Sequence, residues 1–323
     1  MEATKSFTED GITILDGGLA TELPKIGFNI DNDPLWSARI LMNSPSSIKE
    51  VHKRYLEAGS DVLITSSYQT SVPSLIKFGN CSREEALGYI KLSVTVAKDA
   101  CEEFWRGNTC KEDLSGFKKA LRRFPLVAGS VGPYGACQHD CSEYSGKYVD
   151  SMSLEELIEW HRPRMVALVE AGVDLLAIET IPALKEALAL CDLLKSFPST
   201  KAWISFSCKD EQTLCHGEKF TEAVSSLSSF DQVFGVGINC TKPEYIEPLL
   251  RGLQKERIAE DKVKVVYPNS GESWDKGSWL ESDSPKKLCH YASSWIDSGG
   301  KWIGGCCRTS PDDIRSLRES LKS

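Results

Sequence analysis

The sequence lacks three features that would place the protein in a membrane, outside the cell or on nucleic acid. It has no apolar run of 18 residues, so we expect no membrane-spanning helix. Its first six residues contain no apolar stretch of the kind found in signal peptides, so we expect a cytoplasmic protein. It has no excess of positive charge: 38 Lys and Arg stand against 46 Asp and Glu, giving a formal net charge of −8. This balance argues against nucleic acid and anionic membranes as partners and suits a cationic ligand.

Cysteine, in contrast, is plentiful, with twelve residues in a chain of 323. The cysteines are scattered and no export signal accompanies them, so we expect reduced thiols rather than a disulfide framework. The hydrophobic fraction of 41% is ordinary for a globular protein with a large core. Because no linker or break in composition divides the chain, we expect one domain over residues 1–323.

Short β-prone runs alternate with longer amphipathic segments along the whole chain. We expect strands at Ile12–Asp16, Val62–Thr65, Leu126–Ser130, Leu175–Glu179, Ala202–Ser207, Val233–Asn239, Val263–Pro268 and Lys301–Gly305. We expect helices at Ser46–Ala58, Arg83–Arg106, Ser153–Ala171, Pro182–Leu194, Pro243–Lys255, Ser284–Ser298 and Pro311–Lys322. This α/β alternation favours a single (β/α)₈ TIM barrel over its rival, a doubly wound open sheet. The polar, basic segment Gly107–Arg123 is expected to form a surface excursion before the third strand.

In such a barrel the carboxyl ends of all eight strands converge on one face, where active sites lie. Here those ends carry small residues, carboxylates, amides and thiols: Asp16–Gly18, Thr65–Gln69, Ser130–Gly135, Glu179–Thr180, Ser207–Cys208, Asn239–Cys240, Pro268–Gly271 and Cys306–Cys307. So many polar groups beside apolar strands predict the mouth of an active site rather than a packing face.

Three of the thiols come from two strand ends, Cys240 from one and the adjacent Cys306 and Cys307 from the other. Three cysteine ligands leave one tetrahedral position open, which is typical of catalytic rather than structural zinc. Neighbouring residues of a strand point to opposite faces, so both cysteines reach one metal only where the strand ends, and Gly304–Gly305 is expected to supply that freedom. A redox-active pair is the alternative. The loop Cys137–Cys141 fits no standard zinc spacing, and we interpret it as a thiol-rich surface loop.

Two carboxylates stand at strand ends. Glu179 closes an apolar run, and Asp16 is followed by two glycines whose N–H groups can meet a carboxylate. Acids that bind an ammonium group, together with amide donors, are typical of an amino-acid site, whereas the plain alternative for Glu179 is a solvent-exposed loop residue.

Four motifs in order resemble the homocysteine S-methyltransferase family: Asp16–Gly18, Gly237–Cys240, Tyr267–Gly271 and Gly304–Arg308. The resemblance spans about residues 11–321. Two further segments, Asp33–Ala38 and Gly129–Gly135, look closer to the plant and bacterial subgroup that uses S-methylmethionine.

The resemblance implies a (β/α)₈ barrel with one Zn²⁺ per chain, held by Cys240, Cys306 and Cys307, and homocysteine as the fourth ligand through sulfur. It implies that Asp16 and Glu179 hold the homocysteine amino group and that Gly17 and Thr65 offer donors to its carboxylate. Asn239 and Asn269, in the same motifs, are expected to bind substrate too, and Trp36 matches a donor-side tryptophan. Trp36 and Tyr134 are candidates for cation–π contact with a sulfonium.

The implied reaction is direct methyl transfer from S-methylmethionine to a zinc-bound homocysteine thiolate, giving methionine. Gln69 and Thr180 stand where the betaine-dependent relatives carry tyrosines, which argues against betaine as donor. Two alternatives remain open: S-adenosylmethionine as the main donor, and a non-catalytic zinc or redox sensor built on Cys306–Cys307. We favour a monomer that binds only small molecules.

Overall fold

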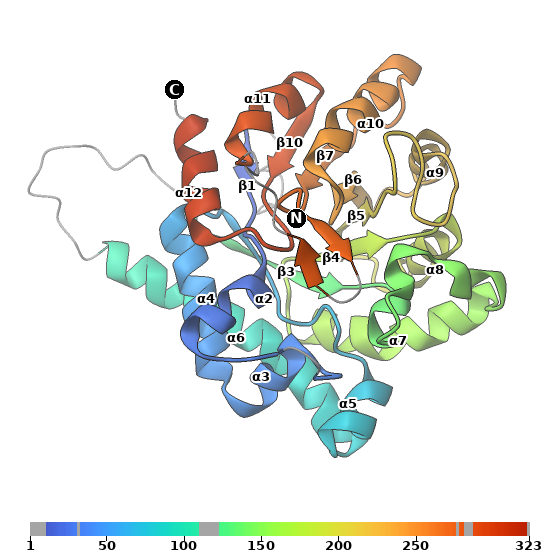
Figure 1. Cartoon of the computed structure of the whole chain (residues 1–323). Coiled ribbons are helices and arrows are strands. Elements are labelled where there is room, and N and C mark those ends of the chain that lie inside the picture. Colours follow the sequence, from blue (N-terminus) through green and yellow to red (C-terminus); the bar gives the residue numbers. More distant parts are fainter. Residues whose placement is uncertain (1–10, 31–32, 110–122, 276–277, 281–286, 322–323) are drawn as a thin grey trace, which may run out of the picture.

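The chain folds into a barrel of parallel strands surrounded by helices, as the computed structural model shows for residues 11–30, 33–109, 123–275, 278–280 and 287–321 (Figure 1). The strands of the barrel are β1 (Thr13–Ile14), β2 (Val62–Ile64), β3 (Leu126–Val131), β4 (Leu175–Ile181), β5 (Ala202–Phe206), β6 (Val233–Asn239), β7 (Val263–Tyr267) and β10 (Gly300–Ile303). All eight overlap the predicted strands, and β6 has the predicted bounds. A small antiparallel hairpin, β8 (Ser273–Asp275) and β9 (Ser278–Leu280), was not predicted.

The sheet runs in the order β1-β10-β7-β6-β5-β4-β3-β2, with every pair parallel. One parallel bridge, Leu15 to Val62, joins its two edges and nearly closes the barrel. Side chains complete this seam. The Asp61 carboxylate accepts the N–H of Ile14 at 2.9 Å, and the Asp16 carboxylate accepts the N–H of Ile64 at 2.9 Å. The expected TIM barrel is therefore confirmed, and the open-sheet alternative is wrong.

The helices connect successive strands and cover the outside of the barrel (Figure 1). Seven match the predicted ones: α4 (Pro45–Ala58), α6 (Arg83–Thr109), α7 (Leu154–Glu170), α8 (Leu184–Leu194), α10 (Pro243–Glu256), α11 (Cys289–Asp297) and α12 (Pro311–Ser320). Ser153 and Glu156 form the capping box that their spacing indicates at the start of α7. The short helices were missed because they span too few residues for a period to show: α2 (Leu19–Glu22), α3 (Ser37–Asn43), α5 (Val72–Gly79) and α9 (Phe220–Ser226).

Two predicted helix boundaries differ from those in the structure. Helix α6 continues to Thr109, so the start of the expected surface excursion is helical, and residues 110–122 of that segment lie outside the described residues. Helix α11 begins at Cys289, later than predicted, and residues 284–286 also lie outside the described part.

Among the helices that the structure describes, none has the length and apolarity to cross a bilayer.

Alternate residues of the strands fill the barrel interior. This inner cluster includes Trp203, Trp302 and Tyr267, all at most 1% exposed. The two indoles meet edge to face with ring centroids 5.7 Å apart, and the Tyr267 hydroxyl accepts a hydrogen bond from Trp203 Nε1 at 2.9 Å. Because the interior is packed with side chains, any ligand has to bind at an end of the barrel, and the loops after the strands decide what it meets.

Candidate metal and substrate site

The carboxyl ends of β6 and β10 bring the three predicted cysteines together. Cys240 follows β6 directly, and Cys306 and Cys307 follow β10 after two glycines. Their Sγ atoms all lie within 4.8 Å of one another, and Cys240 Sγ is 3.6 Å from Cys307 Sγ. Cys240 is 7% exposed, while the other two cysteines are partly exposed, so the cluster opens toward solvent on one side.

The turn that carries Cys306 and Cys307 packs closely against the turn after β1. The Gly305 N–H donates to the Asp16 carbonyl at 3.0 Å, and a Cβ on Gly18 would lie only 2.6 Å from the Cys306 carbonyl oxygen. Gly304 and Gly305 are not among the glycines with positive φ. The expectation that they supply unusual backbone angles is therefore wrong. They are needed because a Cβ on Gly304 would lie 2.6 Å from Leu15 Cβ at the end of β1, and a Cβ on Gly305 would clash with the Thr309 side chain.

Cys240 has a left-handed backbone, with φ of 48°. Such an angle is uncommon outside glycine, and strained residues of this kind gather at functional sites. Its N–H donates to the Tyr267 carbonyl at 3.2 Å, which fixes the turn against β7.

Two polar side chains approach the sulfur atoms within hydrogen-bond distance. The Tyr144 hydroxyl lies 3.3 Å from Cys240 Sγ, and Asn239 Nδ2 lies 4.0 Å from Cys306 Sγ. Asn239 is fully buried and is fixed by Thr180, which donates its N–H to Asn239 Oδ1 and accepts from Asn239 Nδ2 through its hydroxyl, both at 2.7 Å.

The cluster fits a tetrahedral zinc ion. Sulfur ligands with Zn–S bonds of about 2.3 Å lie about 3.8 Å apart, close to the Cys240–Cys307 separation. Hydrogen bonds from the other two thiols lower the pKa of Cys240 well below its usual value, so the cluster readily holds a thiolate. Within the described residues it is the only group of three potential metal ligands of this kind. In the other cysteine loop, Cys137 is buried with its thiol 3.4 Å from the Gln69 carbonyl, while Cys141 is exposed, so no second cluster forms there.

Two buried carboxylates lie beside the sulfur cluster. Glu179 is 6% exposed, and burial raises its pKa to about 7, although hydrogen bonds from the Ser130 and Tyr267 hydroxyls offset part of the effect. Burial raises the pKa of Asp16 well above its usual range, and the charge of Glu179 raises it further while the Ile64 N–H lowers it. Two carboxylates that destabilise each other in a buried site are suited to a cation. The solvent-exposed alternative for Glu179 is wrong.

Gly17 and Thr65, the two predicted hydrogen-bond donors to the substrate carboxylate, differ in whether they are already hydrogen-bonded within the protein. The N–H of Gly17 makes no hydrogen bond within the described part of the chain, so it remains available to a ligand. The Thr65 hydroxyl is occupied: it accepts the Ser130 N–H at 2.9 Å and lies 2.7 Å from the Ser67 hydroxyl, which itself donates to the Ser130 carbonyl. Thr65 therefore supports the strand ends, and its neighbour Ser66 has a buried hydroxyl with no partner among the described residues.

Asn269, Trp36 and Tyr134 are less directly placed. Asn269 Oδ1 accepts the Gly271 N–H at 3.0 Å, which shapes the turn after β7. Trp36 is partly buried against the core with a φ of 47°, and no ring contact or side-chain hydrogen bond among the described residues ties it to the cysteines. The Tyr134 ring packs against Tyr148 and Trp160, with centroids 5.1 and 5.0 Å away, so its placement indicates packing.

Sequence reasoning missed Tyr144 and Glu143, which come from the long connection between β3 and α7. This connection contains the 3₁₀ turns Gly135–Cys137, Ser142–Tyr144 and Lys147–Asp150 and has no hydrophobic period. Burial and the nearby Cys240 sulfur raise the pKa of Glu143 to about 7. The only signal in the sequence was the length of this polar connection at the end of a strand.

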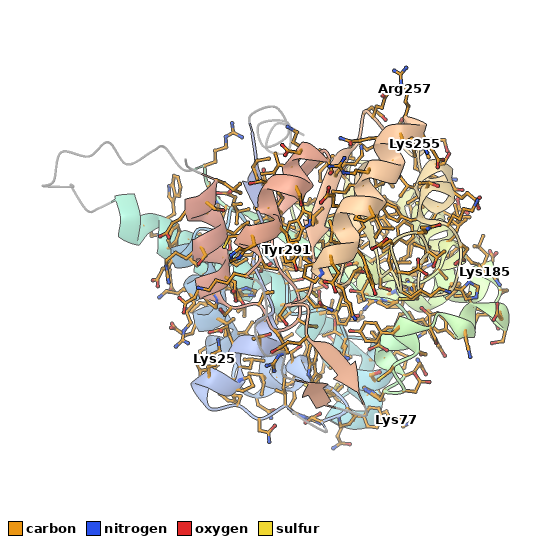
Figure 2. The ribbon with its side chains drawn as sticks, turned by 45° about the horizontal axis from the view of Figure 1, so that its top comes forward. Lys25, Lys77, Lys185, Lys255, Arg257 and Tyr291 are labelled. Carbon is orange, nitrogen blue, oxygen red and sulfur yellow. The ribbon has the colours of Figure 1, made fainter. Side chains whose placement is uncertain are left out.

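A buried ionic network holds this connection in place. Arg164 of α7 donates to the carbonyls of Tyr68, at 2.8 Å, and Gly132, and lies 2.9 Å from His161 Nδ1. Since arginine only donates, His161 uses its other nitrogen to donate to Glu186 at 2.8 Å. Glu186 also accepts the Tyr134 N–H at 2.7 Å. Lys185, labelled in Figure 2, adds a bond to the Val149 carbonyl at 2.7 Å.

Comparison with known proteins agrees with this geometry. The family described as homocysteine S-methyltransferase matches residues 13–321. The Bacillus subtilis protein named homocysteine S-methyltransferase YbgG is 44% identical over 314 residues, which cover 97% of this chain and 95% of that protein. Homocysteine S-methyltransferase 1 of Zea mays is 42% identical, with the same coverage of the two chains. The crystal structure of the Escherichia coli homocysteine methyltransferase MmuM in its metallated form superposes with a TM-score of 0.84 at 37% identity, covering 98% of both chains.

Proposed function

Because the chain belongs to the homocysteine S-methyltransferase family, we propose that it moves a methyl group from S-methylmethionine to the thiol of L-homocysteine, using zinc held by Cys240, Cys306 and Cys307. The products are two molecules of methionine. The observation that carries the proposal is the open three-cysteine cluster lying beside two buried carboxylates.

The carboxylates suit the amino group of homocysteine. Asp16 and Glu179 lie buried near each other, and an ammonium group between them relieves their repulsion and their desolvation. The free N–H of Gly17, in the turn that contacts Cys306, is available for the substrate carboxylate. In this proposal Thr65 and Asn239 support the site rather than contact the substrate, because their polar atoms bond to other protein groups.

The amino-acid end is thereby fixed while the thiol reaches the open side of the cysteine cluster. When bound, zinc would supply the acidity that converts the substrate thiol to a thiolate. No protein base is needed for the transfer itself. The chain's contribution is to align thiolate and methyl donor and to surround them with negative charge, which favours a cationic sulfonium over a neutral donor.

The choice of donor rests on charge and on two residues. A sulfonium is cationic, and the three thiolates of the proposed zinc site would attract it. Gln69 and Thr180, which replace the tyrosines expected for betaine, are engaged with protein groups: Gln69 Nε2 donates to the Ala136 carbonyl at 3.0 Å, and Thr180 bonds to Asn239. S-Adenosylmethionine is also a sulfonium and remains the rival donor. The non-catalytic sensor is no longer required, because the chain belongs to a family of enzymes.

The test is methionine formation from homocysteine with each of three donors, S-methylmethionine, S-adenosylmethionine and betaine, at matched concentrations. Zinc-loaded protein is compared with the same protein after dialysis against a chelator. We expect turnover that depends on zinc and is fastest with S-methylmethionine. Faster turnover with another donor would contradict the choice of S-methylmethionine. Full activity without metal would contradict the proposed zinc site.

We also propose that the chain works as one domain and as a monomer in the cytoplasm. Among the described residues, only three large hydrophobic side chains are exposed, Ile76 in α5, Phe124 before β3 and Tyr144 after β3, and so few favour a monomer. Light scattering of the purified protein would show a mass near 35.7 kDa for a monomer.

A further inference from the structure

When cysteines hold zinc, their own sulfurs compete with the substrate sulfur for the methyl group. In the proposed zinc site, bound homocysteine would add a fourth thiolate to those of Cys240, Cys306 and Cys307. Each has a lone pair that can attack the methyl group of a sulfonium. The enzyme survives many turnovers only if its own sulfurs react much more slowly than that of the substrate.

The three protein sulfurs differ in the donors that surround them. The Tyr144 hydroxyl lies 3.3 Å from Cys240 Sγ, and Asn239 Nδ2 lies 4.0 Å from Cys306 Sγ. Among the described residues, Cys307 Sγ has no hydrogen-bonding neighbour other than cysteine thiols. A zinc-bound cysteine is a thiolate and can only accept, so in the loaded site the tyrosine is the donor.

We propose that Tyr144 protects Cys240: its hydroxyl donates to the thiolate and keeps that sulfur from taking the methyl group meant for homocysteine. The inference rests on the proposed zinc site. Hydrogen bonds to a metal-bound sulfur withdraw electron density from it, and charge-assisted bonds of this kind are about twice as strong as neutral ones. Homocysteine, which binds at the open side, receives no such donor from Tyr144 and stays the best nucleophile.

The hydroxyl of Tyr144 is held where this role requires it. Tyr144 as a whole residue is 40% exposed, yet its hydroxyl lies 3.3 Å from the sulfur of Cys240, which is 7% exposed. The turn that carries it, Ser142–Tyr144, is bonded to the barrel where the Ser207 hydroxyl donates to the Glu143 carbonyl at 3.5 Å. The Arg164–His161–Glu186 network fixes the start of the same connection.

The reaction that this arrangement opposes is simple to balance. A lone pair of Cys240 Sγ forms a bond to the methyl carbon, the bond from that carbon to the sulfonium breaks, and its electrons stay on the departing sulfur. The products are S-methylcysteine in the protein and a neutral thioether. A thioether is a poor zinc ligand, so each such event disables one site.

The test measures alkylation of the cysteines rather than activity. Zinc-loaded wild type and Tyr144→Phe are treated with methyl iodide, which needs no donor pocket, and S-methylation at each of the three cysteines is quantified by peptide mass spectrometry. Methylation of Cys240 relative to Cys307 in the same molecules should rise about 10-fold in the variant, because one charge-assisted hydrogen bond is lost. Tyr291→Phe, at a tyrosine of α11 labelled in Figure 2, is the matched control and should leave the ratio unchanged.

Zinc content is measured on the same samples. An unchanged ratio in a variant that keeps its zinc would overturn the proposal, and so would loss of zinc from the variant, since the hydroxyl would then hold the site together rather than protect it. Wild type alone gives a second check: methyl iodide should modify Cys307 before Cys240, and the reverse order would contradict the idea. Because methyl iodide replaces the biological donor, these outcomes stay separate from the choice of S-methylmethionine.

Discussion

Glu179→Gln should make the protein more stable and at the same time weaken its binding of homocysteine. In the folded chain the pKa of Glu179 is about 7, raised from 4.5 mainly by burial. A carboxyl group with a raised pKa binds its proton more tightly in the folded state than in the unfolded state. Stability is therefore full at pH values below the unfolded pKa, and it is lost as the pH rises through the folded pKa.

The size of the loss follows from the two pKa values. By proton linkage, the raised pKa of Glu179 lowers the free energy of unfolding by about 1 kcal/mol at pH 5, where only the unfolded state ionises, and by about 3 kcal/mol at pH 8. A glutamine has no charge to bury, and its amide oxygen can still accept from the Ser130 hydroxyl. The variant should accordingly exceed wild type in free energy of unfolding by an amount that grows by about 2 kcal/mol between these pH values.

The assay is urea denaturation at pH 5, 6.5 and 8, together with calorimetric titration of homocysteine into both proteins. Homocysteine should bind to wild type more weakly as the pH falls below 7, because the carboxylate that meets its ammonium becomes protonated. It should bind to the variant at least 10-fold more weakly at pH 8. A variant whose stability gain does not depend on pH, or one that binds homocysteine as wild type does, would refute the reasoning. Glu159→Gln, on the exposed face of α7, is the control.

Three further changes test other parts of the structure. Cys307→Ala should abolish both zinc binding and turnover, which metal analysis and methionine formation will show; a variant with full zinc would contradict the ligand set. Tyr55→Phe removes a buried hydroxyl that bonds to the carbonyls of Gly18 and Thr309 at 3.0 and 2.9 Å, and should lower the free energy of unfolding by about 1–2 kcal/mol in urea titrations. Glu186→Gln leaves the buried Arg164 without its counter-charge and should cost about 3 kcal/mol by the same measurement, whereas a neutral effect would mean that the network is not needed for folding.

Much of the fold could be predicted because it depends on local pattern. The β6 strand, Val233–Asn239, has the predicted bounds since its apolar run ends sharply at an amide and a cysteine. The start of helix α7 could be predicted because its capping box, from the N-cap Ser153 to Glu156, is encoded within four residues. The order of eight such units then favours a barrel.

What could not be predicted depends on contacts between distant segments. The Tyr144 hydroxyl meets a sulfur 96 positions along the chain, and the turn that carries it has no period to reveal its direction. The need for glycine at Gly304 follows from Leu15 and Asp16 at the end of β1, which only the closed barrel brings near. Thr65 was placed correctly at a strand end, but the partners of its hydroxyl depend on the neighbouring strand.

The seam between β1 and β2 gives Asp16 two duties. Its carboxylate closes the barrel by accepting the Ile64 N–H, and it is also proposed to hold the substrate. A mutation at this position therefore confounds two effects, since a lost activity could come from an opened seam as well as from a missing ligand. Natural variation is constrained in the same way: a lineage that changes its acceptor molecule is not free to discard this acid. Glu179 accepts from the hydroxyls of Ser130 and Tyr267 rather than from the backbone of another strand, so at this position architecture and specificity can evolve separately.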